Sequence, residues 1–161
     1  MTGVREARAA DAQAIWQILE PIFRAGETYT VERDIGRTEA LAYWCDPPHR
    51  VYVAERDGAV LGTYYLTPNQ RGGGAHVANC GYATAPAAQG QGIARAMLEH
   101  SLAEARAQGF RAMQFNFVVA SNARALETWR RAGFEIVGRL PGAFAHPRLG
   151  PVDACVLYRR L

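Results

Sequence analysis

The stretch T-A-P-A-A-Q-G-Q-G-I-A-R-A-M, Thr84 to Met97, decides the fold because it joins two elements of different periodicity. An apolar segment of β character, Val77 to Ala83, precedes it, and an amphipathic helix follows it. The turn between them contains Gly90 and Gly92 and no acidic side chain. Free backbone N–H groups and the positive end of a helix dipole favour an anion there, and glycine lets a phosphate approach the main chain. The stretch predicts a site for a phosphorylated ligand. The helix repeats its apolar residues at Ala94, Leu98, Leu102 and Ala105.

Length and composition are typical of a globular protein. A chain of 161 residues can bury a core without disulfides or metals, so we expect residues 1–161 to form a single domain. Hydrophobic residues make up 49% and charged residues 20%. The formal net charge is +3, but the basic residues are scattered and form no block that would track a nucleic-acid backbone. We therefore expect no nucleic-acid partner, whereas a weak positive field suits a polyanionic cofactor.

The cysteines and the N-terminus bear on location. Cys45, Cys80 and Cys155 are odd in number and lack C-x-x-C spacing, so neither a disulfide framework nor a metal site is expected. Free thiols fit a reducing cytosol. The start, M-T-G-V-R-E-A-R, carries charge where a signal peptide has its apolar core, and no apolar run reaches membrane-spanning length. These features predict a cytoplasmic protein with no membrane partner.

Periodicity and turn residues divide the N-terminal half into further elements. A short strand is expected at Gly3 to Arg8, and Asp11 is expected to cap a helix that kinks or ends near Pro21. A loop and a second short helix, capped by Thr38, follow. Two strands then flank Asp57-Gly58, which is a hairpin signal. We place these two strands at Val51 to Arg56 and Val60 to Leu66.

The C-terminal half adds three strands and a helix. Met113 to Val119 is expected to be a strand, and Asn122 is expected to start a helix that ends at Gly133-Phe134. The final strand pair is placed at Glu135 to Leu140 and Val152 to Arg160, joined by a long loop. The resulting order, β-α-α-β-β-β-α-β-α-β-β, predicts an α/β (α+β) domain. It has a mixed, mainly antiparallel sheet of about seven strands with about four helices on its two faces.

The glycine turn does not fit the common nucleotide-binding motifs. A Walker A loop ends in G-K-[ST], and this turn has no lysine. A dinucleotide-binding fingerprint needs a third glycine where Arg95 stands. The residues present are Gln89-x-x-Gly92-x-Ala94. This pattern resembles the pyrophosphate loop of the GNAT superfamily of acyl-CoA-dependent N-acyltransferases, which reads [Q/R]-x-x-G-x-[G/A].

A second motif agrees with the first. The run N-A-R-A-L-E-T-W-R-R-A-G-F, Asn122 to Phe134, resembles the superfamily pattern N-x-x-A-[L/I]-x-x-[Y/W]-x-x-x-G-F and lies one strand further on, as in that superfamily. With the element order, the resemblance covers essentially the whole chain. It implies the GNAT fold, in which the strands at Val77 to Ala83 and Met113 to Val119 splay apart and leave a cleft.

The resemblance also implies which residues bind the cofactor, acetyl-CoA or a longer acyl-CoA. The main chain near the end of the first splayed strand would pair with the pantetheine amides, the glycine turn would wrap the pyrophosphate, and Asn122 would hydrogen-bond the pantetheine arm. In this superfamily a late loop and terminal strand often mediate a homodimer. The implied cofactor residues are Tyr82, Ala83, Thr84, Gln89, Gly90, Gln91, Gly92, Ile93, Ala94, Asn122 and Trp129.

Trp129 departs from the superfamily pattern. Many members have a tyrosine there as general acid for the departing thiolate, and an indole cannot supply that proton. We expect Trp129 to pack against the cofactor or the core, with proton uptake through water. Catalysis then depends on positioning and on an oxyanion hole formed by backbone N–H groups near Cys80 to Tyr82.

A narrower resemblance suggests catalytic residues. The stretches F-N-F-V-V-A-S-N, Phe115 to Asn122, and V-D-A-C-V-L-Y, Val152 to Tyr158, resemble a subgroup that includes fungal acetyltransferases acting on azetidine-2-carboxylate and related proline analogues. In that subgroup, asparagines on the splayed strands bind substrate and assist catalysis, and the matching residues are Asn79 and Asn116. An unpaired amide in an apolar strand costs about 1–3 kcal/mol, which a substrate carbonyl or carboxylate would offset. The alternative is that each asparagine bonds a neighbouring loop.

The remaining site residues are less well defined. Glu27 and Tyr29 would line the acceptor pocket or belong to a plain surface loop, and Phe144 would fold over the cleft mouth or anchor its own loop. Cys80 has no histidine partner and is expected to be a packed thiol rather than a nucleophile. His146 is expected to be exposed to solvent. The carboxylates and imidazole considered as the general base are Glu27, Asp34, Glu55 and His76.

Three functions follow from the resemblance. The first is an N-acetyltransferase that transfers an acetyl group from acetyl-CoA to the amine of a small molecule, such as an amino acid or proline-like analogue, by direct attack in a ternary complex. The second is a protein or peptide N-terminal acetyltransferase on the same fold. The third is a non-catalytic acyl-CoA-binding regulatory module, which the tryptophan at position 129 would suit.

Overall fold

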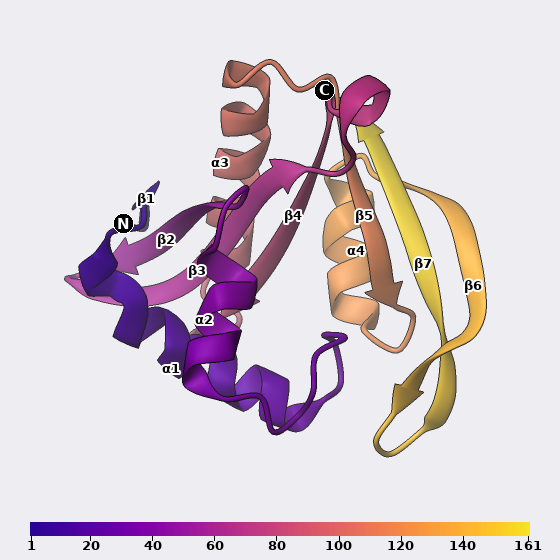
Figure 1. Ribbon diagram of the computed structural model, residues 1–161, viewed down its shortest axis with the longest axis horizontal. Helices are drawn as coiled ribbons and strands as arrows, with labels where there is room; N and C mark the ends of the chain where they lie inside the picture. The colour runs from indigo at the N-terminus through magenta and orange to yellow at the C-terminus, as the bar shows by residue number, and fades with distance from the viewer.

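One mixed sheet of seven strands, in the order β1-β2-β3-β4-β5-β7-β6, runs through the computed structural model, which describes residues 1–161 (Figure 1). The chain order of strands and helices is the one the sequence predicted. The strands are β1 Gly3–Glu6, β2 Arg50–Arg56, β3 Ala59–Pro68, β4 Val77–Thr84, β5 Ala112–Val119, β6 Glu135–His146 and β7 Gly150–Arg160. The helices are α1 Ala12–Ala25, α2 Arg37–Cys45, α3 Ile93–Ala107 and α4 Ala123–Arg131.

The centre of the sheet is where its regular pairing fails. Every neighbouring pair of strands is antiparallel except β4 and β5, which are parallel. These two strands pair only where Val77 lies opposite Ala112 and Ala78 opposite Met113. Beyond that point they diverge, as Figure 1 shows. The expected splayed pair and the mainly antiparallel sheet are therefore confirmed.

Two apolar cores lie on opposite faces of the sheet. One core contains Phe23 of α1 and Trp44 of α2, together with Ala83 of β4. The other contains Met97 of α3 and Phe134 after α4, with residues of β2 to β5 and β7. The side chains of β4 alternate between the two cores, as a strand requires.

The first helix differs from its prediction at both ends. Asp11 does not cap α1 with its side chain; a short 3₁₀ turn, Ala9–Asp11, precedes the helix, and the Asp11 carboxylate accepts the N–H of Arg8 at 2.7 Å. Nor does α1 end at Pro21: it continues to Ala25 and ends at Gly26, whose φ is +66°. Pro21 is exposed, and the apolar face of the helix is buried on both sides of it, so this packing outweighs the missing backbone bond.

The second helix and the first hairpin follow the sequence closely. Gly36, rather than Thr38, precedes the first turn of α2, and the helix ends before Asp46 as expected. The hairpin turn has positive φ at both central residues, +52° at Asp57 and +79° at Gly58, which defines the type I′ turn that Asp-Gly favours.

The last hairpin is longer than expected. Most of the loop predicted after Leu140 is strand, because β6 continues to His146 and pairs with β7 from Gly150 onward. The extra pairing buries Phe144, which is 7% exposed, and His146, which is 6% exposed. The expectation that His146 faces solvent was therefore wrong. Its Nδ1 accepts the N–H groups of Arg148 and Leu149, so the imidazole stabilises the turn.

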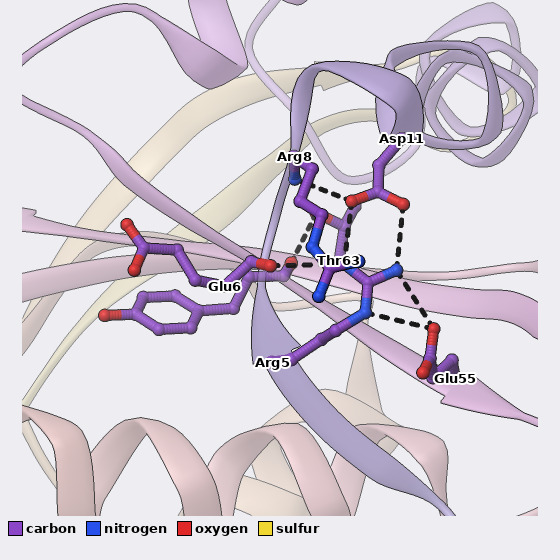
Figure 2. A network of polar contacts seen from close by, with 7 residues as sticks. Arg5, Glu6, Arg8, Asp11, Glu55 and Thr63 are labelled. Carbon is purple, nitrogen blue, oxygen red and sulfur yellow. Dashed lines mark hydrogen bonds and ion pairs between the residues drawn. The ribbon is translucent and has the colours of Figure 1, made fainter.

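An ionic network joins β1 to β2 and to the 3₁₀ turn that precedes α1 (Figure 2). The Arg5 guanidinium donates to both carboxylate oxygens of Asp11, at 2.8 and 3.0 Å, and its Nε donates to Glu55 at 3.1 Å. Asp11 is only 7% exposed. The hydrogen bonds from Arg5, and to a lesser extent that from the Arg8 N–H, lower the pKa of Asp11 against the opposing effect of burial.

We predict that Asp11→Asn destabilises the protein by about 2 kcal/mol at neutral pH, because it leaves hydrogen bonds to a buried charged group unmade. A carboxylate with a lowered folded-state pKa contributes stability above its unfolded pKa of about 3.9 and loses it as the pH falls through the folded-state value. The difference between wild type and variant should therefore shrink on acidification. Urea unfolding from pH 7 to pH 3 measures it, with exposed Asp34→Asn as the control; a difference independent of pH contradicts the prediction.

Candidate functional site

The glycine turn presents a row of free N–H donors at the start of α3. Gly90 and Gly92 have φ values of +76° and +81°. No N–H from Gly90 to Arg95 has a hydrogen-bond acceptor in the protein; the first that does is Ala96, which donates to the Gly92 carbonyl at 3.0 Å. The loop residues Gln89 to Gly92 are exposed. Free N–H donors at the positive end of a helix dipole are an arrangement that suits a phosphate or pyrophosphate.

A glycine in β3 sets the position of this loop. A Cβ at Gly62 would lie 2.7 Å from Ile93 Cγ2 and 2.9 Å from Met97 Sδ. Ile93 and Met97 are almost fully buried, at 1% and 0% exposed, whereas Ala94, expected on the apolar face, is exposed. The first turn of α3 therefore rests directly on the β3 backbone, and the loop is held against the sheet.

The main chain of β4 offers further hydrogen-bonding groups. Asn69 N–H donates to Val77 O, and Ala85 N–H donates to Leu61 O, both at 2.8 Å. Because pairing with β3 alternates along an antiparallel strand, the odd-numbered residues of β4 face β3. The main-chain groups of Cys80, Tyr82 and Thr84 therefore face the splay, whereas those of Ala83 are turned to β3.

The two asparagines expected in catalysis have partners within the protein. Asn79 Nδ2 donates to Gln114 O at 2.9 Å, which links β4 to β5 just beyond their last paired residues. Asn116 Nδ2 donates to Asn69 Oδ1 at 2.7 Å, and Asn116 Oδ1 accepts from Gln114 Nε2 at 2.9 Å. The asparagines are thus not bonded to each other but share Gln114 as a neighbour. Each amide retains one N–H.

Helix α4 presents the other two expected cofactor residues. Asn122 Oδ1 caps the helix by accepting the Ala125 N–H at 3.3 Å, and its Nδ2 donates to no protein group in the structure. The Trp129 ring packs at centroid distances of 5.0 Å from Tyr82 and 4.9 Å from Phe115. Trp129 thus fills the space between α4 and the splayed strands.

Burial governs the ionisation of the groups at the splay. It raises the pKa of the Cys80 thiol to about 12, so at neutral pH this residue is a packed thiol and not a thiolate nucleophile. Burial also raises the pKa of Tyr29 and Tyr82 well above the ordinary value. Both phenols are therefore protonated: Tyr29 donates to the Tyr82 carbonyl at 2.6 Å, and the Tyr82 hydroxyl lies 2.7 Å from Ser101 Oγ.

The loop between α1 and α2 and the β6–β7 turn meet on the far side of the splay from α3. Tyr29 of that loop reaches the splay through its bond to Tyr82, and Glu27 forms an ion pair with Arg148 of the turn at 2.9 Å. The Phe144 ring lies 6.2 Å from that of Phe117 in β5. Figure 1 shows the loop and the hairpin end near the same end of β5.

The residues considered as the general base are not gathered at one point. Glu55 is bound to Arg5 at the β1–β2 edge, far along the sheet from the splay. Asp34 and His76 are exposed. Glu27 alone is joined to the elements beside the splay, through Arg148.

Sequence reasoning missed Gln114 and Arg148. Gln114 lies within the strand expected at Met113 to Val119, but its link to both asparagines depends on the register of β4 and β5. Arg148 lies in a stretch expected to be loop, so no periodicity marked it. Elsewhere, no three His, Cys, Asp or Glu side chains cluster so as to hold a metal ion. None of the helices combines the length and apolarity needed to span a bilayer.

The site combines a splayed parallel pair, a helix-start loop of free N–H donors and free main-chain groups along the splay. This arrangement suits a phosphorylated, extended ligand. A model of the Acetyltransferase (GNAT) family matches residues 12–134. The chain therefore belongs to this family of acetyl-CoA-dependent acyltransferases, as the two sequence motifs predicted.

Individual relatives are consistent with this membership. The N-acetyltransferase aca1 of Schizosaccharomyces pombe is 32% identical over 134 residues, which cover 73% of this chain and 64% of that protein. The chain thus spans a little less than two thirds of that relative. A GCN5-related N-acetyltransferase structure from Kribbella flavida is 40% identical, with a TM-score of 0.94; the match covers 99% of this chain and 98% of that one. A ribosomal-protein-alanine N-acetyltransferase structure from Brucella melitensis is 26% identical, with a TM-score of 0.84 and coverage of 99% of both chains.

We predict that Gly62→Ala destabilises the protein by about 1–3 kcal/mol, because the added methyl overpacks the contact with Ile93 and Met97. Chemical unfolding measures the change. The matched control is Gly3→Ala in β1, where an added Cβ meets no atom within 4 Å; it should change stability by less than about 0.5 kcal/mol. Equal stabilities for the two variants would show that α3 does not rest on Gly62.

Proposed function

We propose that this chain is an N-acetyltransferase that moves an acetyl group from acetyl-CoA to the amine of a small molecule, such as an amino acid or a proline-like analogue. The row of unpartnered N–H groups from Gly90 to Arg95, beside the splay between β4 and β5, is the observation that carries the proposal. We place the whole activity in one domain of residues 1–161. The family membership and the relatives support acetyl transfer to nitrogen.

The residues present fit acetyl-CoA. The loop from Gln89 to Ala94 would hold its pyrophosphate, and the main chain of Tyr82 and Thr84 would pair with the pantetheine arm. Asn122 Nδ2, which has no protein partner, would donate to the same arm. Trp129 would bound the site from α4. When bound, acetyl-CoA supplies a thioester that an amine can attack.

The chain's own groups would promote that attack by position and by electrostatics. The Cys80 N–H group faces the splay next to the main-chain groups assigned to the pantetheine arm, and it would stabilise negative charge on the acyl oxygen. Asn79 and Asn116 would each direct their remaining N–H to the acceptor. The indole N–H of Trp129 is too weakly acidic to protonate a leaving thiolate, so solvent would supply that proton and would take the one that the amine loses.

The acceptor side favours a small molecule over a peptide. The Glu27–Arg148 ion pair joins the α1–α2 loop to the β6–β7 turn, and Phe144 and His146 are buried in the same hairpin end. A peptide would need these elements to part, whereas a small amine would fit beneath them. The N-terminal acetyltransferase alternative is nevertheless supported by the Brucella melitensis relative, and the experiment below separates the two.

The proposal predicts that the protein releases thiol from acetyl-CoA in the presence of a small amine. The panel should include proline analogues, amino acids, polyamines and N-terminal peptides, with thiol release followed by colour and the product identified by mass spectrometry. Small amines should give the highest kcat/KM. Turnover on peptides alone would establish the peptide enzyme, and cofactor binding without turnover on any amine would indicate a regulatory module.

We also predict that Asn116→Ala lowers kcat/KM for the acceptor about tenfold or more, because the acceptor loses a hydrogen-bond donor, while the KM for acetyl-CoA stays the same. The control is Asn69→Ala, which removes the protein partner of Asn116 Nδ2 but not the amide itself, and should cost less. Unchanged turnover in Asn116→Ala would show that this asparagine serves only the network of Asn69 and Gln114.

A further inference from the structure

Arg56 is the last residue of β2, yet its guanidinium reaches the glycine loop. Its Nη2 donates to the Gln91 carbonyl at 2.9 Å, and its Nη1 donates to Gln91 Oε1 at 3.3 Å. On the other side, Arg56 Nε and Nη2 donate to Thr2 Oγ1 at 3.1 and 2.7 Å. The side chain is thus held between the N-terminus and the loop.

The contact fixes the orientation of one peptide unit in the loop. In a trans peptide the carbonyl and the following N–H point in opposite directions. When Arg56 holds the Gln91 carbonyl, the N–H of Gly92 is turned away from Arg56, in the middle of the free donors from Gly90 to Arg95. Gln91 is also tied at its other end, since its Nε2 donates to Ala87 O at 3.1 Å. Both glycines beside Gln91 have positive φ and allow this unit to rotate when it is not held.

The charge of Arg56 is not neutralised within the protein. It takes part in none of the ion pairs of the structure, in contrast to Arg5, Arg95 and Arg139, which each bind a carboxylate. An uncompensated cation held against the loop adds to the positive potential of the helix start. Thus geometry and charge act in the same direction on an anion bound there.

We propose that Arg56 is a positioning residue for the pyrophosphate loop: it holds the Gln91 carbonyl so that the loop's N–H groups face the diphosphate of CoA before CoA binds. This inference rests on the proposed function, because it presumes that CoA is the ligand. The advantage is preorganisation, since a loop that is already ordered loses less conformational entropy on binding. Arg56 acts through the loop and not on the reacting atoms.

The test measures CoA binding by calorimetry and compares two acetyl donors. Arg56→Ala should weaken CoA binding about tenfold, which corresponds to about 1.4 kcal/mol. It should raise the KM for acetyl-CoA while leaving kcat within about twofold. Turnover of S-acetylpantetheine, which lacks the diphosphate, should not change. Arg56→Lys keeps the charge but not the two-pronged contact, so it should fall between wild type and alanine. The control is Arg50→Ala, at the exposed opposite end of β2.

Several outcomes would overturn the inference. If Arg56→Ala binds CoA as wild type does, or loses activity equally with both donors, Arg56 does not act through the pyrophosphate loop. If Arg56→Lys matches wild type, charge alone is sufficient and the positioning role is wrong. Circular dichroism confirms that each variant is folded. Failure of the proposed function gives a different result. A peptide enzyme or a regulatory module would still bind CoA more tightly as wild type than as Arg56→Ala, whereas a wild type that binds no CoA would overturn both proposals.

Discussion

The parallel pairing of β4 and β5 stops after Ala78 and Met113, and the rest of the site is arranged around the main-chain groups that this leaves free. A strand whose N–H and C=O groups lack a partner is normally an energetic liability. Here the structure compensates for part of that cost internally: Asn79 bridges to the Gln114 carbonyl, and the Tyr29 hydroxyl satisfies the Tyr82 carbonyl. The groups that remain are the ones a strand-like ligand would meet.

The two faces of the sheet present different kinds of side chain around this gap. On the face of α3 and α4, Trp129 packs against Tyr82 and Phe115 and bounds the opening with aromatic rings. On the face of α1 and α2, the polar side chains of Asn79, Gln114 and Asn116 follow the strands, and Tyr29 approaches from the loop. The donor of the acyl group and its acceptor would thus reach the gap from opposite faces, which suits direct transfer.

The sequence predicted the local geometry of the candidate site better than the contacts between distant residues, and the reason is physical. The Gln89 to Ala94 loop and the Asn122 cap are local features, determined by glycine conformations and by residues within a few positions of each other. The remaining contacts of the site depend on strand register. Gln114 contacts both asparagines only because of the register between β4 and β5. The main-chain groups of Ala83 point away from the gap because hydrogen bonding to β3 alternates along β4. The predicted loop between β6 and β7 is wrong for a similar reason. Its proline- and glycine-rich sequence is typical of a loop, but cross-strand pairing extends the hairpin and buries Phe144 and His146.

The ion pair between Glu27 and Arg148 has a consequence for folding order and for divergence. The cofactor loop and α3 take the contacts that hold them from β2 and β3, which precede them in the chain, whereas the acceptor side closes only when the N-terminal α1–α2 loop and the C-terminal β6–β7 turn have both docked. A partly folded protein would thus have its phosphate site before it has a complete acceptor side. The same separation lets mutations in the α1–α2 loop and the β6–β7 turn change acceptor preference while the phosphate site stays intact.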